Sequence, residues 1–342
     1  MKNNKSGDTI KIFTFELNYS RQDNPVRTMY PSMAHEWANL DPAEYFKLHL
    51  DFGINAFFTY AYAFGGYAFY PTKLGPVAPG QGQNFIPRLY ELCKKANMPF
   101  WSYFCVGTDV TASALHNEWI VPESRNENGI GFLAPETPWT DLLCARIREF
   151  LSLYPADWML FDWFFYGSWQ PNSPVKRAWF VEKPFKRIIG RTMPESAGEI
   201  TSEESLKYKR QVLADQFYRI RDTVKEASQN TKIMFNVPYA EPAEPLWIEH
   251  PMVSQSDGLF SECLKADIVE WLLSIKKPGQ RVMTTMTGHP YKDWCEPESW
   301  KKWFNKGCDL FAYAGGTPPK LEIEPRLIKD VEIVRQAFRQ IP

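Results

Sequence analysis

The sequence predicts a (β/α)8 barrel, in which eight parallel strands alternate with helices. Short runs rich in Phe, Tyr, Trp, Val and Ile alternate along the chain with longer stretches of helical periodicity. The length of 342 residues leaves room for insertions, because this fold typically takes about 250 residues. A doubly wound open sheet is the alternative. It is disfavoured because no glycine-rich fingerprint follows the first apolar run. Residues 13–16 (Phe-Thr-Phe-Glu) lead on to residues 21–24 (Arg-Gln-Asp-Asn), which contain no glycine.

The predicted strands are bounded in most cases by Gly, Pro or Asn, residues that favour turns. They cover residues 10–18, 55–62, 100–106, 158–164, 232–237, 258–263, 281–287 and 309–314. The predicted helices cover residues 42–52, 86–96, 139–153, 202–227, 266–275, 298–305 and 324–339. Together they make seven complete strand–helix units and one weaker one.

Residues with capping preferences mark several helix ends. Asp41 is followed by Pro42, a favoured first helical residue, and acidic residues fill the first turn after Ser202. Gly53 and Gly307 stand where helices should end. The fifth unit, 239–257, contains three prolines, so a regular helix is doubtful there.

Composition excludes several classes of protein. The chain has 39 basic and 40 acidic residues and a net charge of -1, which excludes a general electrostatic attraction to nucleic acid or to an anionic membrane. With 44% hydrophobic and 23% charged residues, wholesale disorder is excluded as well. Aromatic residues make up 15% of the chain, which suits either a bulky core or a sugar-binding cleft.

The chain is expected to be one domain over 1–342, without a cofactor or a bound metal. The six cysteines are not spaced as in a zinc or redox motif, and five scattered histidines make a His-rich metal site improbable. The N-terminus shows no cleavable signal region, and no window of about 18 apolar residues exists. We therefore expect a cytoplasmic protein with no membrane contact, although removal of a signal peptide would leave the same pattern.

Long loops follow the second, third and fourth predicted strands. The first, beginning at Phe64, is rich in glycine and aromatic residues, and the others cover 107–138 and 167–201. In barrel enzymes the carboxyl ends of the strands carry the chemistry, so the position of these loops indicates a site.

Two carboxyl groups interrupt apolar strands. Asp162 lies in the run 158–165, among aromatic and aliphatic residues, and Glu262 lies in the run 259–263. Burying such a group costs several kcal/mol unless it has partners, which favours function over a structural cap or an exposed strand end. A pair of carboxyl groups across a barrel mouth can act as nucleophile and acid/base in glycoside hydrolysis.

Other polar and aromatic side chains are expected at the same end of the barrel, as partners or as surfaces for stacking on sugars. From strand placement these are Glu16, Asp109, Asn236, His289 and Tyr313, with Trp119, Trp163, Trp169 and Tyr70 as stacking candidates.

Four segments in order give the chain a family resemblance. Residues 55–58, the Tyr70–Lys73 loop (Tyr-Pro-Thr-Lys), the His116–Trp119 motif (His-Asn-Glu-Trp) and the run 158–162 resemble the hypothetical glycosyl hydrolase 6 family, related to the α-L-fucosidase superfamily. The similarity covers 54–165, about a third of the chain.

The resemblance implies a (β/α)8 fold, glycosidase activity and Asp162 as nucleophile at the end of strand four. It also implies that Tyr70, Lys73, His116, Glu118 and Trp119 lie near the sugar. The chain departs from the fucosidases in lacking their His-His pair after strand two, where 62–66 reads Tyr-Ala-Phe-Gly-Gly, and in lacking a C-terminal β-sandwich pattern.

The sequence thus predicts a glycoside hydrolase acting on a carbohydrate, retaining by the fucosidase resemblance, with Asp162 as nucleophile and Glu262 as acid. A catalytically inactive carbohydrate-binding barrel, or a barrel lyase or isomerase acting on sugars, remains the alternative.

Overall fold

The computed structural model describes most of the chain. The described residues are 9–15, 40–78, 80, 82–125, 131–167, 173–237, 244–262, 266–286, 299–314, 316–317, 322–323 and 328–341. Among their helices, none combines the length and the apolar character that a membrane crossing requires.

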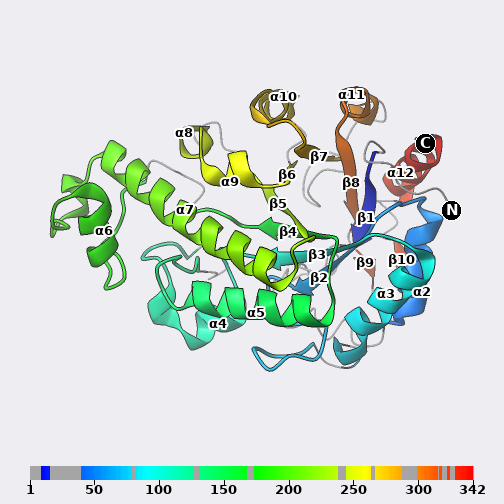
Figure 1. The fold of residues 1–342 in the computed structure, drawn as a ribbon, viewed down its shortest axis with the longest axis horizontal. Coiled ribbons are helices and arrows are strands. Elements are labelled where there is room, and N and C mark those ends of the chain that lie inside the picture. The colour runs from blue at the N-terminus through cyan, green and yellow to red at the C-terminus, as the bar shows by residue number, and fades with distance from the viewer. Residues whose placement is uncertain are drawn as a thin grey trace.

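Eight parallel strands form one sheet that curves into a nearly closed barrel (Figure 1). Their order in the sheet is β1-β8-β7-β6-β5-β4-β3-β2, so the last strand lies beside the first. The strands are β1 Lys11–Phe15, β2 Phe57–Tyr62, β3 Phe100–Cys105, β4 Trp158–Asp162, β5 Lys232–Asn236, β6 Gly258–Ser261, β7 Arg281–Thr285 and β8 Asp309–Ala314. This arrangement confirms the predicted (β/α)8 fold.

Helices surround the strands. The described ones are α2 Pro42–Asp51, α3 Gly82–Ala96, α4 Val110–Leu115, α5 Trp139–Leu153, α6 Glu182–Ile189, α7 Ser202–Ala227, α8 Glu244–Trp247, α9 Pro251–Gln255, α10 Ala266–Ile275, α11 Ser299–Asn305 and α12 Ile328–Gln340. In Figure 1, α5 and α7 pack side by side, while α6 and the start of α7 project at the left end of the molecule.

The elements agree with the predicted ones to within a few residues, and three helices, α5, α7 and α10, have the predicted bounds. The proline-rich fifth unit forms two short helices, α8 and α9, in place of one regular helix. The sequence patterns did not predict α4 and α6, which lie in the chain after β3 and after β4, or the small hairpin of β9 Gly316–Thr317 and β10 Glu322–Ile323.

Asn55 joins the two strands that share no hydrogen-bonded ladder, β1 and β2. Its Oδ1 accepts a bond from the Lys11 amide (2.7 Å), its Nδ2 donates to the Thr9 carbonyl (2.8 Å), and its own amide donates to the Lys11 carbonyl (3.2 Å). Asn55 therefore makes three hydrogen bonds to the start of β1 and to Thr9 before it, two through its side chain and one through its backbone amide.

Aromatic side chains fill the barrel. The Phe311 ring of β8 lies 5.1 Å from Phe58 of β2 and 5.1 Å from Phe260 of β6, contacts that cross the interior. Near the amino-terminal ends of the strands, Trp101 and Trp158 stack at 4.7 Å. The interior is thus a packed core, and in barrel enzymes of this kind the active site lies at the carboxyl ends of the strands.

Alternation along the strands sets the direction of each side chain. In β5, Phe235 contacts Phe217 of α7, so it faces the helices, and Phe161 of β4 contacts Phe235 on that same side. Asp162 and Asn236, each the next residue in its strand, therefore point into the barrel.

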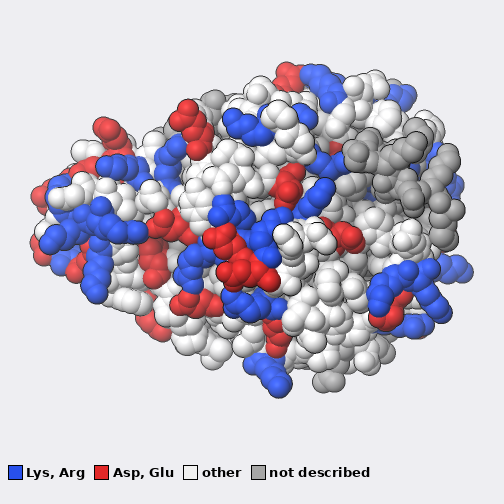
Figure 2. Space-filling view, viewed as in Figure 1, with Lys and Arg blue, Asp and Glu red and all other residues white. Residues whose placement is uncertain are grey.

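Figure 2 shows charges of both signs interspersed over the face that carries α5 and α7. Ion pairs on these exposed faces include Arg148–Glu226 (3.7 Å), Arg187–Asp215 (2.7 Å) and Arg219–Asp141. This is the surface expected of a chain whose charges nearly balance.

Replacing Asn55 with Ala should destabilise the barrel at the β1–β2 seam. The change removes two side-chain hydrogen bonds and leaves the Lys11 amide without its acceptor, so we expect a loss of about 1–3 kcal/mol in the free energy of unfolding. Urea denaturation measures it as a lower midpoint with an unchanged slope. The same change at Asn230, an exposed residue before β5, should leave the midpoint within about 0.5 kcal/mol of the original. Equal midpoints for both variants would show that the seam does not depend on Asn55.

Candidate active site

Asp162 is the last residue of β4 and is buried at the carboxyl end of the barrel. Its Oδ2 accepts a hydrogen bond from the Tyr103 hydroxyl (2.9 Å) of β3. Its Oδ1 accepts bonds from Asn236 Nδ2 (2.8 Å) of β5 and from the backbone amide of Trp163 (2.7 Å). Donors from the two neighbouring strands and from the next residue thus hold the carboxyl group in one orientation.

Two opposing effects act on the protonation of Asp162. Burial raises the pKa of its carboxyl group above the ordinary value, while the hydrogen bonds from Asn236, Trp163 and Tyr103 act in the opposite direction. Burial also raises the pKa of the neighbouring Cys105 thiol, and the negative charge of Asp162 acts in the same direction.

The backbone turns sharply after Asp162. Trp163 has φ of 58°, a left-handed conformation that costs a non-glycine residue roughly 1 kcal/mol or more. Gly107 lies against the Trp163 carbonyl, so closely that any side chain at 107 would collide with it. The Trp163 ring is half-buried and packs 4.8 Å from Phe64 and 5.8 Å from Phe132, rings of the loops after β2 and β3.

Glu262 follows β6 directly and is half-buried. The strand register pairs Phe161 with Phe235 and Asn236 with Phe260, which puts Phe260 at the level of Asp162. Glu262 is two residues further along, so the alternation of β6 assigns it to the inward side, one step nearer the mouth.

Asp109 is buried in contacts within the protein. It caps α4 through a bond from the Ala112 amide (2.6 Å), and its Oδ2 pairs with Arg146 of α5 (2.6 Å), which is also buried. Gly66 of the preceding loop lies against the same carboxylate. The side chain joins the loop after β2, α4 and α5.

Tyr70 is fully buried. Its ring packs against Phe150 of α5, against Tyr154, which follows that helix, and against Tyr62 at the end of β2. Lys73 is exposed, and its backbone amide donates to Glu149 (3.1 Å). These contacts attach the loop after β2 to the outside of the barrel.

His116, Glu118 and Trp119 lie together at the surface of the loop after β3. The His116 and Trp119 rings stack at 3.7 Å and 7°, and His116 Nδ1 lies 3.2 Å from a Glu118 carboxylate oxygen. The motif quoted from the sequence therefore forms one cluster.

Four further residues were predicted at this end of the barrel. Glu16, Trp169 and His289 lie outside the described residues. Tyr313 is placed by its backbone, which pairs with Thr14 in the β8–β1 register.

Two residues of this region were not predicted. Tyr103 could have been found from the sequence, since it lies two residues after Trp101 and therefore on the same face of β3. Only the tertiary structure shows that its hydroxyl reaches Asp162. Glu136 lies in the loop before α5, where no strand or helix periodicity indicates the direction of its side chain.

Glu136 is enclosed by tyrosines. Its Oε1 accepts bonds from the hydroxyls of Tyr208 of α7 and of Tyr166 (3.1 Å), whereas its Oε2 is buried with no hydrogen-bond partner among the described residues. Burial raises the pKa of the Glu136 carboxyl to about 7. Tyr166 is four residues beyond Asp162, so this cluster connects the chain after β4 to the helix layer.

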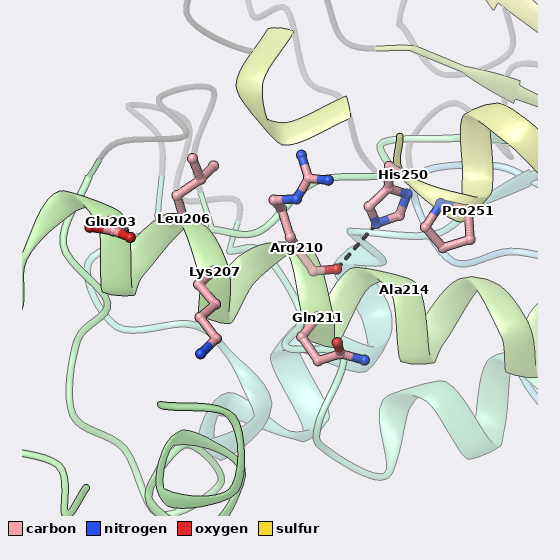
Figure 3. A pocket seen from close by; sticks show the side chains of 8 residues that line it. All are labelled: Glu203, Leu206, Lys207, Arg210, Gln211, Ala214, His250 and Pro251. Atoms are coloured by element: carbon pink, nitrogen blue, oxygen red, sulfur yellow. Dashed lines mark hydrogen bonds between the residues drawn. The ribbon is translucent and has the colours of Figure 1, made fainter. Parts of the chain in front are cut away.

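A hollow of about 480 Å3 lies on the outer side of the barrel, between α7 and the start of α9 (Figure 3). His250 in its wall accepts a bond from the Met252 amide (3.2 Å) at Nδ1 and lies 3.2 Å from the Arg210 carbonyl at Nε2. Burial lowers the pKa of His250 to about 4, so this histidine is neutral at pH 7. Its bond from the Met252 amide makes it the N-cap of α9. The hollow lies at the outer surface of the helix layer, whereas Asp162 points into the barrel.

No group of three or more His, Cys, Asp or Glu side chains that could hold a metal ion occurs among the residues with described positions.

Solved α-L-fucosidases share the fold. Isoenzyme 2 from Paenibacillus thiaminolyticus matches with a TM-score of 0.70 at 13% identity, over 97% of this chain and 49% of that chain. An unliganded α-L-fucosidase from Lactobacillus casei matches with a TM-score of 0.51 at 14% identity, over 91% and 83%. The Thermotoga maritima α-fucosidase matches with a TM-score of 0.51 at 12% identity, over 93% and 61%.

These likenesses confirm the expected resemblance to α-L-fucosidases in the fold. The chain spans about half the length of the Paenibacillus enzyme. No protein-family model matches the chain, and no curated protein matches it by sequence.

Replacing Glu136 with Gln should flatten the dependence of stability on pH. A folded-state pKa of about 7, above the ordinary 4.5, means that the contribution of this group is fully present below pH 4.5 and is lost as the pH rises through 7. The free energy of unfolding should therefore fall by about 1–3 kcal/mol more in the original protein than in the variant over this range.

Denaturant titrations at several pH values between these limits measure the difference. Glu226→Gln, a change at an exposed residue of α7, provides the control and should reproduce the original pH dependence. A Glu136→Gln profile parallel to that of the original protein would contradict the assignment.

Proposed function

We propose that this chain is a glycoside hydrolase of the α-L-fucosidase type that acts on a carbohydrate by a retaining mechanism. The observation that carries the proposal is the position of Asp162: an inward-pointing carboxyl group at the end of β4, held by donors from β3 and β5, in a fold shared with α-L-fucosidases.

Asp162 is proposed as the nucleophile. Hydrogen bonds to both carboxyl oxygens stabilise its charged form and fix its direction, and the packed core below leaves the mouth as the side from which a sugar can approach. The oxygen attacks the anomeric carbon, forming a glycosyl ester while the leaving oxygen departs. Water then hydrolyses this ester with overall retention of configuration.

Glu262 is proposed as the acid/base. It would protonate the leaving oxygen in the first step and accept a proton from water in the second. Its half-buried place after β6, one inward step nearer the mouth than Asp162, supports this role. A retaining enzyme requires the two carboxyl groups about 5–5.5 Å apart across the bound sugar.

The remaining predicted residues are proposed to contribute to binding. Trp163 directly follows Asp162 in the loop after β4, and the His116–Trp119 cluster belongs to the loop after β3. Asn236 is proposed to orient the nucleophile through its hydrogen bond to Asp162 (2.8 Å). Asp109 and Tyr70 are proposed to act through the loops that they anchor, since both are buried.

Asp162→Asn should lower kcat on 4-nitrophenyl glycosides by several orders of magnitude while sugar binding persists, because the amide is a poor nucleophile of the same shape. Azide should restore turnover of Asp162→Gly and give the glycosyl azide of inverted configuration. Glu262→Gln should lose little on a 4-nitrophenyl glycoside and much more on a disaccharide, whose leaving group needs the proton.

Product configuration by NMR and rates on both kinds of substrate check this pair. Full activity of Asp162→Asn would remove the proposed nucleophile. Full activity of Glu262→Gln on the disaccharide would place the acid elsewhere. If the original protein bound glycans but turned over none, the inactive-barrel alternative would replace the proposal.

Tyr103→Phe should shift the acidic limb of kcat/KM to higher pH. The change keeps the ring but removes the bond to Asp162 Oδ2, which favours the ionised carboxylate, so the pKa of Asp162 should rise further. A hydrogen bond to a charged group corresponds to a shift of about one to two pH units. The pH profile on a 4-nitrophenyl glycoside measures it. A uniform loss of rate with an unmoved limb would indicate that Tyr103 acts only on packing.

A further inference from the structure

Trp179 is the one aromatic residue among the large hydrophobic side chains that the structure describes as exposed, with 61% of its surface in water. It lies in the chain between β4 and α6. An indole left in water forgoes the stabilisation that its burial would provide, and tryptophan is enriched where proteins bind ligands and partners.

Trp179 is held in place on the loop after β3. Its Nε1 donates to the Glu118 carbonyl (3.1 Å), and the nearby pair of Lys176 with Glu123 (3.0 Å) makes a second contact between the same two loops. The exposed ring is therefore fixed without a ligand, which keeps the entropic cost of binding low.

The segment that accepts the Trp179 hydrogen bond carries exposed polar side chains. Glu118 exposes 57% of its side chain and His116 exposes 40%, and the His116 ring stacks on Trp119 at 3.7 Å. Leu115 beside them is 72% exposed. We call these five residues (Leu115, His116, Glu118, Trp119 and Trp179) the Trp179 surface.

The chemistry of the Trp179 surface suits a sugar ring. A pyranose has an apolar face of C–H groups, which packs on an indole, and a rim of hydroxyls, which bond to carboxylate and imidazole groups. An apolar protein partner would bury the exposed Glu118 carboxyl group against carbon and offer it no hydrogen bond, which is costly.

The position of the surface decides which sugar it takes. The unit under attack must reach the buried carboxyl group of Asp162, inside the ring of strands. The loops that form the Trp179 surface begin where β3 and β4 end, at the paired residues Cys105 and Asp162. A chain of sugars that extended outward from Asp162 along these loops would bring a further unit over the exposed indole.

We propose that the Trp179 surface binds the leaving-group sugar of an oligosaccharide substrate, with the indole of Trp179 against the pyranose face. This inference rests on the proposed function, since it takes the sugar attacked by Asp162 as the neighbouring unit. It makes Trp179 a determinant of specificity for oligosaccharides over simple glycosides.

The test separates binding from turnover. Asp162→Asn protein is applied to an array of oligosaccharides with terminal fucose and other terminal sugars, and the affinity for the glycans bound is measured by calorimetry. Adding Trp179→Ala should weaken binding by about tenfold or more, because the apolar face of the sugar loses its contact. Adding Trp179→Phe, which retains a ring but removes the Nε1 donor, should weaken it less.

Ile248→Ala, a change at another exposed hydrophobic residue (46% exposed), provides the control and should leave the affinity unchanged. Thermal unfolding checks that each variant is folded. Equal affinity with and without Trp179→Ala, or no oligosaccharide bound at all, would overturn the proposal.

Measurements of turnover distinguish a failure of the leaving-group assignment from a failure of the proposed hydrolase function. In the otherwise original chain, Trp179→Ala should lower kcat/KM for an oligosaccharide about tenfold more than for the 4-nitrophenyl glycoside of the same terminal sugar. Equal losses on both substrates would overturn the leaving-group assignment. Glycan binding that depends on Trp179 in a chain with no turnover of any 4-nitrophenyl glycoside would overturn the hydrolase and the leaving-group role together.

Discussion

The burial of one carboxyl group at the top of an apolar barrel is the constraint on which the proposed site depends. A charge at Asp162 is tolerated only if donors replace the water it has lost, and three donors do so: Tyr103, Asn236 and the Trp163 amide. These come from two neighbouring strands and from the following turn. The need to satisfy the carboxylate therefore ties the chemistry to the register of β3, β4 and β5.

The aromatic interior makes that register rigid. Phe58, Phe260 and Phe311 meet across the barrel interior, and Met234 fills the space that the missing side chain of Gly258 leaves. A close-packed core resists small displacements of its strands, so the donors stay aligned with the carboxylate. Most of the described aromatic residues are thus buried in packing contacts, and few are exposed at the surface.

The loops after β3 and β4 are joined at several points of different character. The Trp163 ring packs on Phe132, Tyr166 bonds to Glu136 (3.1 Å), and Trp179 bonds to the Glu118 carbonyl (3.1 Å). The contacts run from the core outward to solvent. A substrate that extended from Asp162 over these loops would meet a surface already ordered before binding, which reduces the entropy lost on association.

The sequence by itself determined the alternation of strands and helices, the strand that carries Asp162 and the doubtful helix of the fifth unit, because these follow from local periodicity and proline positions. It also led to the fucosidase resemblance, which the fold confirms. Only the tertiary structure decided that Tyr103 reaches Asp162, that Asp109 pairs with Arg146, and that Tyr70 is enclosed. Each of these depends on contacts between residues far apart in the chain, which strand register and helix packing set and local patterns do not encode.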